Sequence, residues 1–337
     1  MSFSIGIVGL PNVGKSTLFK ALTKQSVDIS NYPFCTINPN VGVVAVPDKR
    51  LDEIAKIIKP KKVTPTVIEF VDIAGLVKGA HQGEGLGNQF LSHIRQVDAI
   101  CQVVRNFTNG KITHVEGEIN PQRDIEIINT ELTMKDLETV SKRLGKTKKQ
   151  AQELEALNQI KQILEQGKLI KDQKEILTNQ KLIQELGFLT AKPTIYLFNT
   201  ISDKPPKSNH HAISLDLKTE SDISELSSEE IEEIGFASSK LDELIKASYQ
   251  ALNLITFYTI TGGQETRAWT LKKGYRAPQA GGVVHSDFED NFIKAEVINW
   301  QKLVDSKTWQ AAREKGFIRT EGKEYLVSDG DVIEFKI

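Results

Sequence analysis

The chain has 337 residues, two to three times the usual domain length of roughly 100 to 200 residues, so more than one domain is expected. Its 43 Lys and Arg nearly balance 44 Asp and Glu, and 39% hydrophobic with 26% charged residues is a globular composition that excludes wholesale disorder. No apolar run approaches the roughly 20 residues that cross a bilayer, and residues 1–10 lack the features of a signal peptide, so we expect a cytoplasmic protein without membrane contact. The two cysteines, Cys35 and Cys101, form no CxxC pair, which excludes a disulfide framework and a cysteine zinc site.

The first hundred residues alternate short β-branched runs with amphipathic or glycine-rich stretches. Strand-like runs cover residues 4–9, 65–72 and 98–107, and a helical pattern covers residues 15–24. This alternation predicts βαβ units and a parallel sheet. A later apolar run, residues 194–198, predicts a buried strand that returns to the same sheet.

Between these strands, residues 121–188 carry apolar residues at helical spacing and predict an antiparallel helical hairpin, broken near Gly145. The hairpin tip carries five cations without an intervening acid: Lys142, Arg143, Lys146, Lys148 and Lys149. Such a run is either a solvated helix end or a tip that contacts RNA. Because both flanks look like strands of one sheet, the hairpin is predicted to be an insertion.

A helical pattern covers residues 241–252, and from about residue 255 short β runs alternate with glycine pairs. Residues 324–327 and 332–337 flank an Asp-Gly pair and predict a terminal β-hairpin. We therefore predict four stretches: an α/β domain in two parts, residues 1–120 and 191–254, a helical insertion, residues 121–190, and a C-terminal α+β domain, residues 255–337.

A phosphate-binding loop is the most specific motif, because Gly9 to Ser16 fit GxxxxGK[ST] between a strand-like run and a helical pattern. Backbone N–H groups of such a loop point inward, and the helix N-terminus adds positive charge. Lys15 is expected to bridge the outer phosphates, and the Ser16 hydroxyl to contact Mg²⁺. The predicted nucleotide contacts of the loop are Asn12, Val13, Gly14, Lys15, Ser16 and Thr17. A glycine-rich turn without a ligand is the alternative.

A second motif, DxxG, starts at Asp72 directly after a strand-like run. Asp72 is expected to hold Mg²⁺ through water, and the Gly75 N–H to reach the γ-phosphate. Between the two motifs, residues 31–36 form a loop suited to a switch segment that presents Thr36 to the metal. Ser16, Thr36 and Asp72 are therefore the predicted metal ligands, although Thr36 could instead be an ordinary loop residue.

Hydrolysis needs a group that orients the attacking water, and Ras-like enzymes use a glutamine directly after DxxG. This chain has Leu76 there, which cannot form such a hydrogen bond. His81, in a glycine-rich stretch that follows, is the nearest candidate catalytic residue. A surface histidine without a catalytic role is the alternative.

The base-recognition position is unusual. A guanine-specific protein of this class has NKxD after the corresponding strand, whereas this chain has Asn199, Thr200, Ile201, Ser202 and Asp203. Ser202 cannot accept the two hydrogen bonds of the guanine edge, and Asp203 lies one residue late. Asn199 is expected to brace the phosphate-binding loop and the base, and backbone groups near Thr200 to meet an adenine amino group.

These signals together resemble the YchF / Obg-like ATPase family, a branch of the translation-factor class of P-loop GTPases. The resemblance covers essentially the whole chain and rests on long stretches, among them GLPNVGKSTLFKALT at residues 9–23, NYPFCTINPNVGVV at 31–44, DIAGLVKGAHQGEGLGNQFL at 72–91 and RDIEIINTEL at 123–132. It implies a G domain with an inserted helical coiled coil and a C-terminal β-grasp domain of the TGS type. The family usually has NxxE at the base-recognition strand, where this chain has Ser202.

The resemblance also implies ATP hydrolysis, Mg²⁺ and association with the ribosome, with possible contact to rRNA but none to DNA. By family motif, His81 takes the place of the missing glutamine, and Asn12 suggests a K⁺ ion beside the phosphates. With Lys15 of the phosphate-binding loop, His81 completes the predicted catalytic residues. Two hypotheses remain open: a slow ATPase whose nucleotide state switches its affinity for the ribosome, and a nucleotide-binding regulator or scaffold in which hydrolysis is marginal. A preference for GTP is a further alternative if Asp203 moves into the position that reads guanine.

Overall fold

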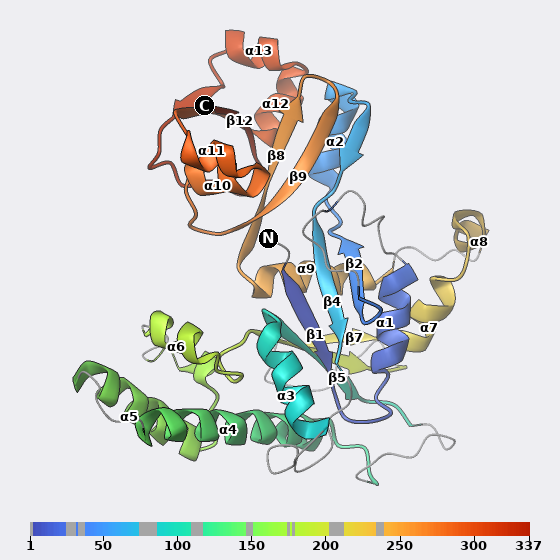
Figure 1. The fold of residues 1–337 in the computed structure, drawn as a ribbon. Helices are drawn as coiled ribbons and strands as arrows, with labels where there is room; N and C mark the ends of the chain where they lie inside the picture. The colour runs from blue at the N-terminus through green and yellow to red at the C-terminus, as the bar shows by residue number, and fades with distance from the viewer. Residues whose placement is uncertain are drawn as a thin grey trace.

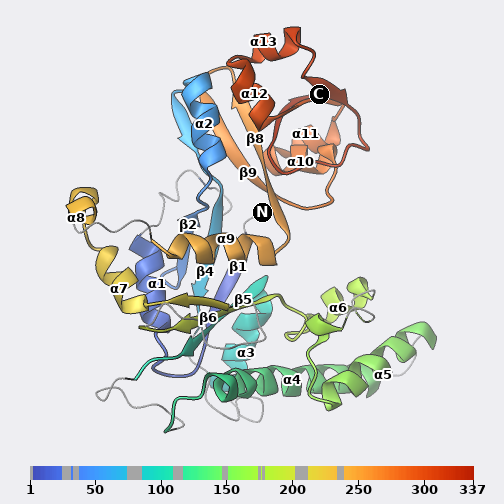
Figure 2. The same ribbon diagram turned by 180° about the vertical axis from the view of Figure 1, so that it is seen from behind.

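The computed structural model describes residues 3–24, 32, 38–73, 86–108, 117–145, 151–173, 176, 179–201, 212–233 and 239–337. Two six-stranded sheets organise this part of the chain. Figures 1 and 2 show the first sheet in the middle of the molecule, the second sheet at one end, and a pair of long helices projecting near the other end. None of the described helices combines the length and apolarity that a membrane span requires.

The first sheet has the strand order β2-β4-β1-β5-β6-β7. Its strands are β1 (Ser4–Val8), β2 (Val41–Ala45), β4 (Val67–Asp72), β5 (Ala99–Arg105), β6 (Thr194–Asn199) and β7 (Ala212–Leu215). All neighbouring pairs are parallel except β2 with β4. The predicted parallel α/β sheet is therefore confirmed, and its central strand β5 is buried along its whole length, as a strand covered on both faces should be.

Helices cover both faces of this sheet. Figures 1 and 2 show α3 (Leu86–Gln96) over one face and α9 (Leu241–Ala251) over the other. Helix α1 (Lys15–Lys24) buries Leu18 and Leu22 in the same core and packs against α7 (Leu217–Ile223), which precedes the short α8 (Ser228–Glu233). The carboxyl ends of the parallel strands remain at one edge of the sheet, where ligands of this fold class bind.

The helical insertion lies between β5 and β6, which are direct neighbours in the sheet. It contains α4 (Pro121–Gly145), α5 (Ala151–Glu165), the 3-10 turn η2 (Ile170–Asp172) and α6 (Gln180–Leu186), which share one apolar cluster. Asp136 of α4 accepts the backbone N–H groups of Leu189 at 2.9 Å and Thr190 at 2.8 Å and so ties the returning chain to α4. Burial raises the pKa of Asp136 to about 6, against the lowering effect of these hydrogen bonds.

The basic tip of this hairpin is less basic than the sequence suggested. Lys142 pairs with Glu138 one turn earlier on α4, and Arg143 pairs with Glu153 at 2.9 Å and Glu185 at 3.0 Å. The acids come from earlier in α4, from α5 and from α6, so a search along the tip alone cannot find them. The other three cations, Lys146, Lys148 and Lys149, lie outside the described residues.

The second sheet has the order β11-β10-β12-β8-β9-β3. Its strands are β3 (Lys62–Thr64), β8 (Leu254–Thr261), β9 (Glu265–Lys272), β10 (Lys294–Asn299), β11 (Arg319–Glu321) and β12 (Asp331–Lys336), and its helices are α10 (Ala277–Val284), α11 (Ser286–Asp290), α12 (Trp300–Ser306) and α13 (Trp309–Glu314). Antiparallel pairs β8/β9 and β10/β11 flank β12, which runs parallel to β8. This is the β-grasp arrangement that the family resemblance implied.

The predicted terminal hairpin is wrong in one of its two strands. Residues 331–336 form β12, but β12 pairs with β10 and β8, and residues 324–327 make only an isolated bridge between Leu326 and Arg276. The Asp-Gly pair still makes the turn, with Gly330 at φ 89°, and the Gly330 N–H donates to Thr256 O of β8 at 2.8 Å. The turn therefore leads the chain into the centre of the sheet instead of back along itself.

One segment from the N-terminal part of the chain completes the second sheet. Between β2 and β4, helix α2 (Lys49–Ile58) packs in the C-terminal core, and β3 pairs in parallel with β9. Arg50 of α2 contacts Asp329 at 2.7 Å, and Tyr258 of β8 donates to Asp48 at 2.5 Å.

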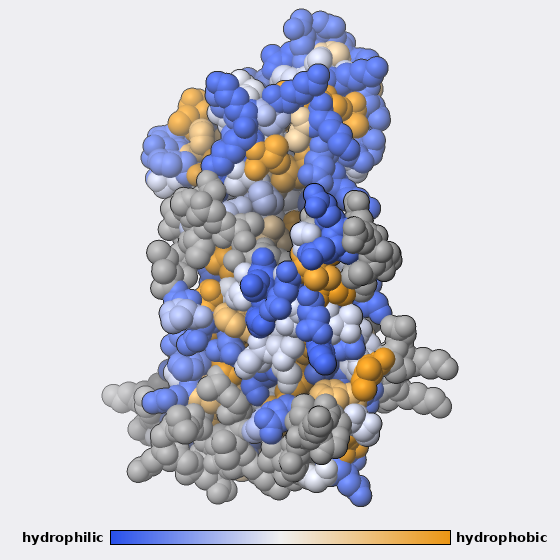
Figure 3. All heavy atoms as spheres, turned by 90° about the vertical axis from the view of Figure 1, so that its right-hand side faces the viewer, coloured by the Kyte–Doolittle hydropathy of each residue, from blue (hydrophilic) through white to orange (hydrophobic). Residues whose placement is uncertain are grey.

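On the face shown in Figure 3, the described residues are largely hydrophilic, with hydrophobic residues in small groups among them.

Candidate functional site

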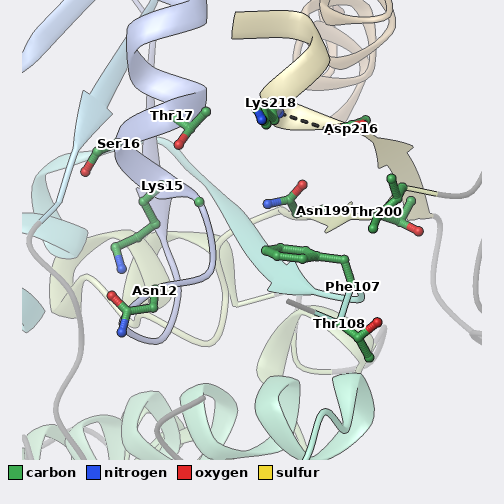
Figure 4. Close-up of a pocket in the computed structure, with 12 residues that line it drawn as sticks. Asn12, Lys15, Ser16, Thr17, Phe107, Thr108, Asn199, Thr200, Asp216 and Lys218 are labelled. Carbon is green, nitrogen blue, oxygen red and sulfur yellow. Dashed lines mark hydrogen bonds between the residues drawn. The ribbon is translucent and has the colours of Figure 1, made fainter. Parts of the chain in front are cut away.

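A cavity of about 560 Å³ lies at the carboxyl ends of β1, β5 and β6. It is lined by Asn12, Gly14, Lys15, Ser16, Thr17, Phe107, Thr108, Asn199, Thr200, Ile201, Asp216 and Lys218. Figure 4 shows the residues of the phosphate-binding loop on one side and Phe107, Thr108 and Thr200 on the other. Seven of the twelve lining residues are ones that the sequence motifs selected, and they come from segments nearly 190 residues apart.

The phosphate-binding loop connects β1 to α1 in a conformation that its residues explain. Asn12 has φ 62° and Gly14 has φ 110°, values that asparagine tolerates and glycine adopts freely. A Cβ atom at Gly14 would lie 2.5 Å from Asn199 Nδ2, so a side chain there would also collide with the neighbouring strand end. Helix α1 starts with the Leu18 N–H donating to Gly14 O at 2.9 Å. The earlier N–H groups of this helix lack intrahelical acceptors and suit an anion.

Asn199 braces the loop from the end of β6. Its Nδ2 donates to Val13 O at 3.0 Å, and its Oδ1 accepts the Leu217 N–H at 3.3 Å. Val13, one of the predicted contact residues, is buried beneath the cavity and contributes its carbonyl to this brace. The Asn199 amide thus joins the loop, β6 and the start of α7 in one hydrogen-bonded unit.

Lys15 and Asp72 influence each other across the loop. Lys15 Nζ donates to Gly9 O at 3.0 Å and Leu10 O at 2.8 Å, which holds the ammonium group over the loop. Burial lowers the pKa of Lys15 while Asp72 raises it, and burial raises the pKa of Asp72 while Lys15 lowers it. Burial thus works against the charge on both groups, so a bound phosphate beside Lys15 and a cation beside Asp72 would each restore a favourable environment.

The described residues that fit a magnesium ion are Ser16 and Asp72. Ser16 is exposed in the first turn of α1, and Asp72 is the last residue of β4, paired in register with Ile7 of β1 just before the loop. Hydroxyl and carboxylate oxygens are hard donors of the kind that Mg²⁺ takes, with water and phosphate completing its shell. Among the described residues, no group of three or more His, Cys, Asp or Glu side chains is arranged to hold a metal ion.

Three predicted site residues lie outside the described residues: Thr36, Gly75 and His81. Ser202 and Asp203, the positions that bear on base recognition, also lie outside them. The structure therefore places the loop, the Asp72 end of β4 and the Asn199 end of β6, and leaves these five residues as predictions.

The far wall of the cavity contains residues that motif reading missed. Phe107 and Thr108 follow the end of β5, and Ile201 follows Asn199 and Thr200 with 70% of its surface exposed. The Thr200 N–H donates to Leu215 O at 2.8 Å, so that N–H is not available to a base. An aromatic side chain directly after the central strand is the signal that could have found Phe107, because the carboxyl end of that strand faces the loop.

Asp216 and Lys218 close the cavity at the start of α7. The Asp216 carboxylate accepts the backbone N–H of Lys218 at 3.0 Å and of Thr219 at 3.2 Å, an N-cap that fixes the first turn. Lys218 is exposed at the cavity rim, where Figure 4 shows it beside Asp216. In the sequence, an Asp at the boundary between a β-type run and a helical pattern is the signal that could have identified this N-cap.

Two family profiles match the chain in consecutive regions. The profile described as "50S ribosome-binding GTPase" matches residues 4–200. The profile of the C-terminal domain of YchF GTPases, described as a protein of unknown function, matches residues 254–337. The first match contains the phosphate-binding loop, and the second contains all of the second sheet except β3.

Similar proteins cover the full length of the chain. Proteins named "Ribosome-binding ATPase YchF" are 48% identical in Bacillus subtilis, over 100% of this chain and 99% of the relative, and 45% identical in Escherichia coli O157:H7, over 99% of each. The solved structure of the Schizosaccharomyces pombe YchF GTPase is 40% identical, covers 99% of this chain and 98% of its own, and superposes with a TM-score of 0.85.

Proposed function

The chain belongs to the YchF family, and we propose that it is a magnesium-dependent P-loop ATPase that binds the ribosome as a nucleotide-dependent regulator. The observation that carries this proposal is the cavity at the carboxyl ends of β1, β5 and β6. It joins a helix N-terminus and a lysine at one end to an aromatic and apolar wall at the other. That polarity suits a ligand with a polyphosphate chain and a planar base.

In this proposal the loop binds the phosphates through the N–H groups at the start of α1, and Lys15 bridges the outer phosphates. The ammonium group is already oriented by Gly9 O and Leu10 O, so little side-chain freedom is lost on binding. Ser16 and Asp72 would hold the metal directly and through water, respectively. Bound Mg²⁺ would neutralise charge on the β- and γ-phosphates.

The remaining roles rest on motif and family resemblance. Thr36 is proposed as a further metal ligand, and the Gly75 N–H as a γ-phosphate contact. His81 is proposed to orient the attacking water in place of the glutamine that Leu76 replaces. Asn12, whose side chain is exposed at the cavity, is proposed to contact a K⁺ ion beside the phosphates.

Ribosome binding is proposed from the names of the relatives and from the profile that matches residues 4–200. From a partner of this kind we infer that the protein acts in the cytoplasm. The other three tip cations, Lys146, Lys148 and Lys149, lie outside the described residues, and their positive charges in the sequence are a physical reason to propose contact with an RNA backbone.

The proposal is tested by ATP turnover of the full chain with and without ribosomal subunits. We expect slow turnover that responds to ribosomes, loss of turnover in Lys15→Ala, and slow hydrolysis with nearly unchanged ATP affinity in His81→Ala. His93→Ala, an exposed histidine on α3, is the matched control and should behave as wild type. An equal loss of affinity and turnover in His81→Ala would make His81 a binding residue.

Turnover that stays at background while ATP and ribosomes both bind would favour the second hypothesis, a regulator or scaffold in which hydrolysis is marginal. GTP turnover belongs in the same experiment, because the solved fission yeast relative is described as a GTPase, whereas the bacterial relatives are named ATPases.

A further inference from the structure

Phe107 stands between two cavities. The nucleotide-sized cavity of about 560 Å³ shares Phe107, Thr108, Thr200 and Ile201 with a second cavity of about 480 Å³. Asn106 and Ile119 complete the second cavity, on the side toward the helical insertion. Figure 4 shows the Phe107 ring extending into the first cavity from the end of β5.

A side chain with open space on two sides is not fixed by packing alone. In a close-packed core, neighbours on every side select one rotamer, whereas a ring between two cavities has room to turn toward either. A base that stacks on a mobile ring loses affinity, because the ring must be ordered on binding. Something other than neighbouring apolar residues must therefore hold Phe107.

Arg105 provides that contact. It is the last residue of β5, only 2% exposed, and its register partner on β6 is Asn199, the residue that braces the loop. Arg105 Nε donates to Phe107 O at 3.2 Å, and Arg105 Cζ lies 4.6 Å from the centroid of the Phe107 ring. One planar guanidinium group thus contacts both the backbone and the ring of Phe107.

We propose that Arg105 is a positioning residue that fixes Phe107 as the stacking wall for the nucleotide base. The inference rests on the proposed function, because it needs a base in the cavity. Arg105 is buried and is not among the residues that line the cavity, so in this proposal it influences the base through Phe107. A wall of this kind stabilises bound substrate and transition state equally, so its loss should raise KM and leave kcat unchanged.

The test compares ATP with inorganic tripolyphosphate, which keeps the phosphates and lacks the base. Arg105→Met removes the cation and the donor at similar length, and Phe107→Leu removes the ring. We expect each to lower ATP affinity about tenfold, the range of a single base stack, while tripolyphosphate affinity stays at the wild-type value. Because both changes remove the same stack, the double variant should lose no more than either single variant. Arg105→Lys, which keeps a cation and a donor, should lose less than Arg105→Met.

Additive losses in the double variant, or an equal fall in tripolyphosphate affinity, would show that Arg105 supports the fold and does not position the base. If Arg105→Met does not fold, the same comparison is made with Arg105→Lys, whose loss of ATP affinity should vanish in the Phe107→Leu background. Unchanged ATP affinity in the Arg105 variants, together with a loss in Phe107→Leu, would reject the role of Arg105 alone, whereas unchanged affinity in Phe107→Leu as well would also reject Phe107 as the stacking wall. Failure of the wild-type chain to bind ATP would instead reject the proposed function and this inference with it.

Discussion

The two six-stranded sheets of this chain use their strands differently. In the first sheet, five of the six strands run parallel, so their carboxyl ends lie at one edge and place Lys15, Asp72, Phe107 and Asn199 around one region. In the second sheet, the pairs β8/β9 and β10/β11 run antiparallel, and the side chains build two apolar clusters that include α10 on one side and α2, α12 and α13 on the other. Parallel strands gather functional groups at an edge, whereas the antiparallel strands of the second sheet mainly build a core.

The two sheets are also interleaved along the chain. The segment between β2 and β4 contributes β3 to the second sheet and packs α2 against it. The chain then re-enters the first sheet as β4. Its return strand ends at Asp72, the candidate metal ligand. A change in the first sheet at the cavity should therefore alter ligand binding, and a change where α2 meets the second sheet should alter stability.

The largest expected effect is on nucleotide binding in Lys15→Ala. We expect Mg-ATP affinity to fall at least a hundredfold, about 2.7 kcal/mol, because the cation that bridges the outer phosphates is lost. Stability should change little, since burial already works against the charge of Lys15 in the folded chain. Titration calorimetry measures the first quantity and thermal unfolding the second. Lys24→Ala, at the exposed end of the same helix, is the control, and equal affinities in both variants would contradict the loop assignment.

Arg50→Met should show the opposite pattern. Arg50 joins α2 to the second sheet through Asp329, and it contacts Asp48 at 2.8 Å. Its removal therefore leaves the half-buried carboxylate of Asp48 without its cation. We expect the free energy of unfolding to fall by about 2 to 4 kcal/mol, with ATP affinity unchanged. Arg313→Met breaks the pair with Glu296 on the exposed side of the same domain and should cost less than about 1 kcal/mol. Denaturant unfolding distinguishes them, and equal losses would show that α2 is not a special junction.

The same junction should be sensitive to acid. Burial alone would raise the pKa of Asp48, but hydrogen bonds from Arg50 and Tyr258 outweigh it and hold the pKa below its usual value. A carboxylate whose pKa is lowered by folding stabilises the folded chain above the unfolded pKa of about 4 and loses that contribution as the pH falls below it. We therefore expect the midpoint temperature of thermal unfolding to fall as the pH decreases below 4, and to fall more steeply in wild type than in Asp48→Asn. Parallel pH profiles for the two proteins would contradict this.

The smallest expected effect concerns the hairpin tip. Changing Lys146, Lys148 and Lys149 to Glu should weaken association with ribosomal subunits and flatten its salt dependence, because fewer counterions are released from RNA. The matched control changes Lys307, Lys315 and Lys323, exposed lysines of the C-terminal domain, by the same total charge. Cosedimentation across a salt series measures both. Identical curves for the two triple variants would assign the tip to simple solvation.

Much of this arrangement was readable from local sequence because it is locally encoded. The strand, loop and helix at residues 4–24 follow from one motif with its flanking patterns, and the helical insertion follows from spacing of apolar residues. The destination of residues 49–64 was not readable, since a helix and a three-residue strand carry no mark of the sheet that they join. The strand predicted at residues 324–327 failed for the same reason: pairing partners are chosen by tertiary packing, and Tyr275, Arg276 and Ala277 meet this segment instead.

The candidate site divides in the same way. The phosphate end has a motif because its backbone geometry demands glycines at fixed positions, as Gly14 shows. The base end is assembled from β5, β6 and α7, with about 90 residues between β5 and β6, and a phenylalanine or lysine there looks like any other. The charge of the tip was overestimated because Glu153 and Glu185 are distant in sequence from Arg143.

We expect the nucleotide site of the first sheet to prefer adenine. The most direct test is a competition titration of ATP and GTP against a labelled nucleotide in the presence of Mg²⁺. Ser202 cannot accept the two hydrogen bonds that make guanine preferable, so we expect ATP to bind about tenfold more tightly, a difference of about 1.4 kcal/mol. A clear preference for GTP, or no displacement by either nucleotide, would contradict the account, and the first result would identify Asp203 as the residue that reads guanine.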